Sequence, residues 1–193
     1  MESNRKMRII SGKFKGRPIM YLKSLSTRPL KDSIKENIFN IIAHSKLINV
    51  VLNNSKILDL YSGIGSFGLE ALSRGAKKIT FIEKNREATN ILEKNINNLS
   101  ARDNIELFKS DINNVLENKK IDKFDIIFLD PPFADKSYIE TIKLIKNKKI
   151  FSKKNLVIIH REKKTEDNLK NVLNVFLTKN YSRSKILFAN FLT

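Results

Sequence analysis

The sequence predicts an α/β protein whose sheet is mostly parallel and ends in an antiparallel hairpin. From about residue 55 onward, strand-like and helix-like segments alternate, which is typical of parallel sheets with helical crossovers. The segments 56–60, 124–129 and 155–160 are apolar throughout, as expected for strands covered by helices on both faces. Only six residues separate 175–179 from 186–192, too few for a helical crossover, so we expect these two strands to form a hairpin.

A basic extension, residues 1–31, precedes the predicted α/β domain, residues 32–193. It holds two short strand-like pieces, Arg8–Ser11 and Pro18–Leu22, joined by a segment with two glycines, and we expect them to resemble a hairpin. Ten basic and two acidic side chains fall within residues 1–35, so an anionic partner is expected to meet this end of the chain.

The domain is predicted to begin with a helix over residues 33–48. Ser33 and Glu36 match a capping box, and four isoleucines at helical spacing form its apolar face. The alternating region that follows predicts strands at 56–60, 78–83, 105–109, 124–129 and 155–160, and helices at 66–74, 86–99, 111–118, 136–147 and 165–173.

Composition limits the classes of function. The chain has 193 residues, a length suited to one domain with a small extension, and its formal net charge of +17 favours a nucleic acid as partner. The absence of cysteine excludes disulfides and thiolate metal sites. We find no signal-peptide pattern and no apolar run near the ~18 residues that a membrane span needs, and therefore expect a cytoplasmic protein without a membrane segment.

A glycine-rich turn after the first predicted strand indicates a cofactor site. Ligands of parallel sheets bind at the carboxyl ends of the strands, where Asp59 is followed by Tyr61, Gly63, Gly65 and Gly68. A carboxylate at this position would repel the pyrophosphate of a dinucleotide but attract the ammonium group of S-adenosylmethionine. We therefore predict S-adenosylmethionine and no metal, with these five residues as cofactor-binding candidates.

Two further acids end the next strands. Glu83 follows the second strand and is predicted to accept hydrogen bonds from the ribose hydroxyls. Asp111 follows the third strand and is either an acceptor for the adenine amino group or the N-cap of the next helix.

The segment Asp130-Pro131-Pro132-Phe133 is the most specific chemical signal in the chain. The carboxylate of Asp130 and the carbonyl of Pro131 are predicted to accept the N–H bonds of an aromatic amine and to stabilise the positive charge that grows on it. The prolines hold these acceptors rigidly, and Phe133 is expected to stack on the base. His160 and Arg161, near the end of the fifth strand, are candidate substrate contacts.

With these residues placed, the chain resembles the bacterial small-subunit (16S) ribosomal RNA guanine-N2 methyltransferases, the type that acts at guanine 966. The resemblance rests on residues 8–17, Thr27-Arg28-Pro29, the turn at 58–76, and 130–133. It implies a seven-stranded Rossmann-like methyltransferase sheet with an antiparallel last strand, and methyl transfer to the N2 amine of a guanine. The chain departs from the family where Ser33 and Lys35 replace usual arginines, which implies fewer bidentate phosphate contacts.

The resemblance also implies a partner, the 16S rRNA within a small-subunit assembly particle, met by a monomer. The candidate RNA contacts are Arg8, Lys13, Lys15, Arg17 and Arg28. Two other functions stay open at this point. One is a DNA adenine-N6 methyltransferase, although 193 residues leave no room for the usual recognition insert. The other is a non-catalytic RNA-binding assembly factor, although all the acids and glycines of the site are present.

Overall fold

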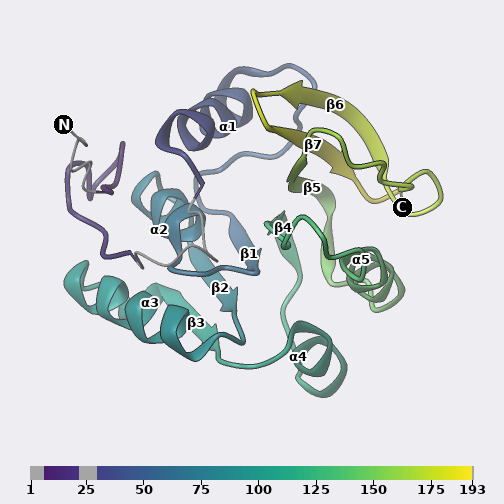
Figure 1. Cartoon of the computed structure of the whole chain (residues 1–193). Helices are drawn as coiled ribbons and strands as arrows, with labels where there is room; N and C mark the ends of the chain where they lie inside the picture. Colours follow the sequence, from purple (N-terminus) through teal and green to yellow (C-terminus); the bar gives the residue numbers. More distant parts are fainter. Residues whose placement is uncertain (1–6, 22–29, 193) are drawn as a thin grey trace.

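A seven-stranded mixed sheet organises the part of the chain that the computed structural model describes, residues 7–21 and 30–192 (Figure 1). Its strands are β1 (Lys56–Leu60), β2 (Lys78–Ile82), β3 (Ile105–Phe108), β4 (Phe124–Leu129), β5 (Phe151–Glu162), β6 (Asn174–Asn180) and β7 (Ser184–Asn190), in the order β3-β2-β1-β4-β5-β7-β6. Strands β1 to β5 pair in parallel, and β7 lies antiparallel between β5 and β6. The predicted parallel sheet with a closing hairpin is confirmed.

Helices cover both faces of the sheet. They are α1 (Asp32–His44), α2 (Ser66–Ser73), α3 (Arg86–Asn98), α4 (Ile112–Asn118) and α5 (Tyr138–Asn147), with a short 3-10 helix at Arg102–Asn104. Figure 1 shows α1, α2 and α3 on one side and α4 and α5 on the other, and each side has its own apolar cluster. None of the helices in the described residues is long and apolar enough to cross a bilayer.

The first helix begins and ends differently from the prediction. Lys31 is the N-cap, and its carbonyl accepts the N–H groups of Ile34 and Lys35. Ser33 therefore lies inside the first turn and cannot cap the helix, so the predicted capping box is wrong. The helix ends at His44 because Ser45 adopts an extended conformation.

The predicted helix at 165–173 is also wrong. The segment is irregular, with one turn in which Val172 and Leu173 donate to the carbonyl of Leu169. Asp167 explains the difference, because its side chain is directed inward by hydrogen bonds from Tyr138 and Arg161. These tertiary contacts outweigh a weak helical pattern.

The described residues of the extension, 7–21, are called the N-terminal arm below. Its two strand-like pieces are joined by a single antiparallel bridge, Arg8 to Pro18, rather than by a regular hairpin. Ile9 and Ile19 are buried in the apolar cluster beneath α1–α3. The arm thus packs on the domain, while Leu22 lies outside the described residues.

Two side chains of α2 hold the arm. The carboxylate of Glu70 accepts the backbone N–H groups of Ile10 (2.7 Å) and Ser11 (3.0 Å). The hydroxyl of Ser73 donates to the carbonyl of Ser11 and accepts the N–H of Phe14. These contacts fix the backbone of the arm against α2.

Lys35 is fully buried beside Glu70. Burial lowers the pKa of Lys35, and the nearby carboxylates of Glu70 and Asp32 offset part of that effect. Its ammonium also donates to the hydroxyl of Ser66 at the start of α2. Because the ammonium group of Lys35 lies inside the protein, it cannot contact RNA phosphates. The lysine at this position, where the family usually has arginine, therefore affects the packing of the interior.

Candidate active site

The carboxyl ends of β1, β2 and β4 bring three acids to one edge of the sheet. Asp59 lies on β1 between its two parallel neighbours, β2 and β4. Glu83 directly follows β2, and Asp130 directly follows β4, with its backbone N–H donating to the carbonyl of Leu60. The structure thus places these three predicted site residues together, as the parallel pairing requires.

Asp59 is a buried carboxyl group with one unfilled oxygen. Its Oδ2 accepts the N–H of Gly68 at 2.9 Å, whereas its Oδ1 has no hydrogen-bond partner among the described residues. Burial raises the pKa of Asp59 well above its usual range, and the charges of Asp130 and Glu83 add to this effect. A buried acceptor without a partner costs free energy, so the group is suited to receive a donor or a cation.

The glycine turn has the conformation that its sequence requires. Gly65 has φ 82°, and a Cβ there would stand 2.3 Å from Leu92 Cδ1. A Cβ on Gly68 would meet the ring of Phe81 at 2.4 Å, so this glycine permits close packing of α2 on β2. At Gly63, by contrast, no atom of the described residues lies within 4 Å of the position a Cβ would take. The turn is therefore closed on its inner side and open at Gly63.

Glu83 links the end of β2 to this turn. Its two oxygens accept the N–H groups of Gly63 and Asn85, each at 2.8 Å. A carboxylate oxygen has a second lone pair, so both oxygens keep capacity for hydroxyl donors. The carboxylate is thereby held in place for the predicted ribose contact.

The remaining cofactor candidates lie nearby with different partners. Asp111 caps α4 by accepting the N–H of Asn113 at 3.0 Å, and its side chain is 55% exposed. The N-cap is one of the two roles that the sequence left open for Asp111. The other role, contact with the adenine amino group, stays a prediction. Tyr61 has φ 55°, and partial burial raises its pKa to about 12, so its hydroxyl stays protonated.

Asp130 is paired with a histidine. Its Oδ1 lies 2.8 Å from Nδ1 of His160, and the Asp130 side chain is 25% exposed. Phe133 is exposed, and its ring meets the imidazole edge-on, with centroids 5.6 Å apart. No described residue donates a hydrogen bond to the carbonyl of Pro131. The carboxylate of Asp130 is thus partly open to solvent, and the carbonyl of the buried Pro131 is without a donor in the described part of the chain.

Arg161 has a different environment from the one expected of a substrate contact. It is 1% exposed, and its guanidinium donates to the carbonyls of Pro132 (3.1 Å) and Phe133 (3.0 Å) and to Asp167 (3.1 Å). The same group lies over the ring of Tyr138. Burial alone would raise the pKa of Asp167. Hydrogen bonds from Tyr138, Lys185 and Arg161 outweigh this effect and hold the pKa of Asp167 below its usual value. Arg161 therefore fixes the loop that carries Phe133.

The candidate RNA contacts of the arm are exposed. Arg8, Lys13, Lys15 and Arg17 all lie on its surface, and Arg17 also donates to the carbonyl of Asn98 at the end of α3. Arg28 lies outside the described residues. The arm thus presents cations on a backbone that α2 fixes.

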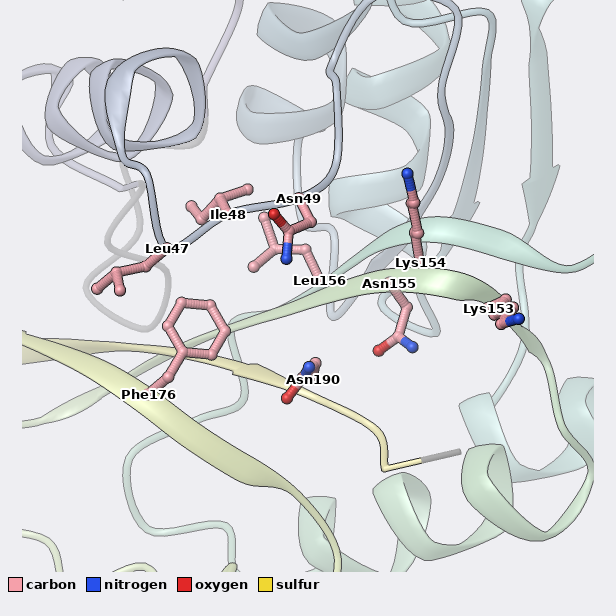
Figure 2. A pocket seen from close by; sticks show the side chains of 9 residues that line it. All are labelled: Leu47, Ile48, Asn49, Lys153, Lys154, Asn155, Leu156, Phe176 and Asn190. Carbon is pink, nitrogen blue, oxygen red and sulfur yellow. The ribbon is translucent and has the colours of Figure 1, made fainter.

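A shallow pocket of about 120 Å³ lies at the opposite edge of the sheet, near the start of β5 (Figure 2). Its lining residues are Leu47, Ile48, Asn49, Lys153, Lys154, Asn155, Leu156, Phe176 and Asn190. It contains no acid and none of the predicted site residues, so we place the candidate active site at the acid-lined edge and not here.

Comparison with known proteins shows the family of the chain. Residues 7–190 match the protein family described as Conserved hypothetical protein 95. "Ribosomal RNA small subunit methyltransferase D" of Buchnera aphidicola subsp. Acyrthosiphon pisum is 34% identical over 161 residues, with 83% of this chain and 81% of the relative covered. The Escherichia coli K12 protein of the same name is 33% identical over 156 residues, with 81% and 75% covered. A solved structure, the putative methyltransferase yhhF from Escherichia coli, has a TM-score of 0.83 at 27% identity and covers 97% of this chain and 99% of that one.

The sheet order and the acid-lined edge define a methyltransferase of the seven-stranded α/β class. Within that class, the chain belongs to the Conserved hypothetical protein 95 family, the family of the proteins named ribosomal RNA small subunit methyltransferase D. The resemblance found in the sequence is confirmed.

Proposed function

We propose that this protein transfers a methyl group from S-adenosylmethionine to the exocyclic N2 amine of a guanine in small-subunit rRNA, and that the target is guanine 966 of the 16S rRNA. The relatives named above support an rRNA substrate. The observation that carries the chemistry is the joint position of an unfilled buried oxygen on Asp59 and an acceptor pair at Asp130 and Pro131.

The residues present fit S-adenosylmethionine. The unfilled Oδ1 of Asp59 suits a cationic group, and the fixed carboxylate of Glu83 suits the ribose hydroxyls. The open side of Gly63 leaves space for a ligand, with Tyr61 beside the turn and Gly65 and Gly68 shaping it. Asp111 remains the proposed acceptor for the adenine amino group. A dinucleotide would place phosphate charge near Asp59, which like-charge repulsion disfavours.

When bound, the cofactor supplies an electrophilic methyl carbon, which bonds to the guanine N2 as its bond to sulfur breaks and leaves the electron pair on sulfur. Asp130 and the carbonyl of Pro131 accept hydrogen bonds from the two N–H groups of the amine and stabilise the positive charge that develops on the nitrogen. Asp130 then takes the proton that the nitrogen loses. Phe133 stacks on the base, and Arg161 holds the loop so that the acceptors keep their positions.

The N-terminal arm is proposed to bind the rRNA backbone with Arg8, Lys13, Lys15 and Arg17, joined by Arg28. Its exposed cations and fixed backbone support this role, since phosphate contacts position an RNA without reading its sequence. We further propose that a monomer acts on a small-subunit assembly particle.

The deciding experiment incubates the protein with small-subunit particles that lack base methylation and with cofactor labelled in the methyl group. Nucleoside mass spectrometry should then show labelled N2-methylguanosine at a single position. Labelled N6-methyladenine in a DNA control would favour the adenine methyltransferase instead. Binding of the particle without any labelled product would indicate a non-catalytic assembly factor.

Asp59→Asn should weaken binding of S-adenosylhomocysteine at least ~10-fold, since a charged hydrogen bond is replaced by a neutral one. Calorimetry measures this loss. Asp125→Asn is the matched control, because its carboxylate also accepts a backbone N–H, that of Lys56, but at the opposite edge of the sheet. Equal affinities of the Asp59→Asn variant and the unmodified protein would remove Asp59 from the cofactor site.

The same variant has a second, pH-dependent effect. Because the pKa of Asp59 is raised by folding, the folded protein holds the proton more tightly than the unfolded chain, and ionisation of Asp59 destabilises the free protein as the pH rises. Asp59→Asn removes this loss. The melting temperature of the variant, relative to the unmodified protein without cofactor, should therefore be higher at pH 8 than at pH 5.

A further inference from the structure

His160 is a buried titratable side chain that the mechanism above does not use. We propose that it is a positioning residue for methyl transfer, whose Nδ1–H holds Oδ1 of Asp130 so that the other carboxylate oxygen faces the substrate amine. The inference rests on the proposed function, because it concerns the geometry of the same acceptor.

The contact with Asp130 fixes the hydrogen on one ring nitrogen. An ionised carboxylate only accepts hydrogen bonds, so Nδ1, at 2.8 Å from Oδ1, must be the donor. The neutral imidazole then carries its lone pair on Nε2. His160 therefore orients Asp130 in the way that a hydrogen-bonded neighbour orients a catalytic group.

The other ring nitrogen argues against a purely structural role. Nε2 is buried and has no hydrogen-bond partner among the residues that the structure describes, and His160 as a whole is 8% exposed. An apolar side chain would fill this place without leaving a polar atom unsatisfied. An imidazole at this position is thus unfavourable for the stability of the fold. Its hydrogen bond to Asp130 explains why a histidine is present here.

Among the described residues, the charged group that contacts the imidazole is Asp130. On β7 the residue paired with His160 is Ile186, and the ring meets Phe133 edge-on. Several charges of the neighbouring elements have other partners. Arg161 and Lys185 contact Asp167, and Lys35 of α1 contacts Asp32 and Glu70. Asp59 and Glu83 contact backbone N–H groups. His160 touches both Asp130 and Phe133, the two side chains proposed to meet the base.

Protonation of the ring would weaken the acceptor. An imidazolium binds a carboxylate through a charge-assisted hydrogen bond and withdraws negative charge from it. The carboxylate would then stabilise the cationic amine less well.

Two substitutions separate the hydrogen bond from mere packing. Asparagine places an amide N–H near the position of Nδ1, whereas glutamine places it near Nε2. His160→Gln should lower kcat roughly tenfold or more at pH 8, the loss of one hydrogen bond to a charged group, while KM for the particle and the affinity for S-adenosylhomocysteine change less than ~2-fold. His160→Asn should recover most of the lost kcat. Equal losses of kcat in the two variants would overturn the proposal.

A measurement on the unmodified protein tests the geometry without any substitution at His160. The chain has two histidines, and the exposed His44 at the end of α1 serves as an internal reference. Nitrogen-15 NMR of the imidazoles should show His160 in the Nδ1–H form at pH 8, and Asp130→Ala should abolish that preference. A His160 ring in the Nε2–H form would refute the inference, whereas the absence of any methylated guanosine with the unmodified protein would instead refute the proposed function.

Discussion

Asp130→Ala should lower kcat by at least ~10²-fold, because it removes an acceptor that acts on charge developing in the transition state. Asp130 lies at the rim, and its side chain is partly open to solvent, so its removal leaves the fold largely intact. The affinity for S-adenosylhomocysteine should change little, since Asp59 and Glu83 hold the cofactor in our proposal. Single-turnover methyl transfer and calorimetry measure the two quantities separately.

Asp130→Asn distinguishes charge from shape. The N–H of His160 would attract the amide oxygen of Asn, which directs the amide NH₂ group toward the substrate amine. We therefore expect a loss close to that of alanine. Asp103→Ala, an exposed carboxylate just before β3, is the control for a general change of net charge. Retention of normal kcat in Asp130→Ala would remove this residue from the chemistry.

The sheet could be predicted because its strands carry strong local patterns. The apolar runs at β1 and β4 are predicted and observed over the same residues, 56–60 and 124–129. Strand β5 begins at Phe151, earlier than predicted. The prediction misses its first residues because the exposed Lys153 and Lys154 interrupt the apolar pattern that predicts the strand. The false helix at 165–173 has the converse cause, a local pattern overridden by the buried contacts of Asp167.

The site could be predicted in part for the same reason. Asp59, Glu83 and Asp130 each follow an apolar strand, so the parallel sheet brings them together. The supporting contacts could not be predicted, because Arg161 reaches residues 28 and 29 positions earlier in the chain. Likewise, the sequence around Glu70 does not indicate that its carboxylate binds the backbone of Ile10 and Ser11, which lie 60 and 59 positions earlier in the chain.

Glu70→Gln should destabilise the protein by ~3–5 kcal/mol, the range for breaking a buried ion pair by removing one partner. Glu70 and Lys35 are both fully buried, and Arg74 donates to Glu70 at 2.7 Å. An amide cannot accept from Ile10 and Ser11 with both of its ends, so one backbone N–H loses its partner. At ~2–4 °C per kcal/mol for a chain of this size, a fall in melting temperature of about 6–20 °C follows.

The matched control is Glu117→Gln, which changes an exposed glutamate of α4 and should leave the melting temperature within about 2 °C.

The position of Glu70 also predicts a functional difference between the two ends of α2. Its amino end follows the glycine turn that we propose binds the cofactor, whereas Glu70 and Ser73 hold the arm. Below its melting temperature, Glu70→Gln should therefore bind S-adenosylhomocysteine normally but bind rRNA more weakly and with a shallower dependence on salt, because the cations of the arm lose their fixed backbone. Unchanged RNA affinity and salt dependence would show that the docked arm is not the RNA-binding element.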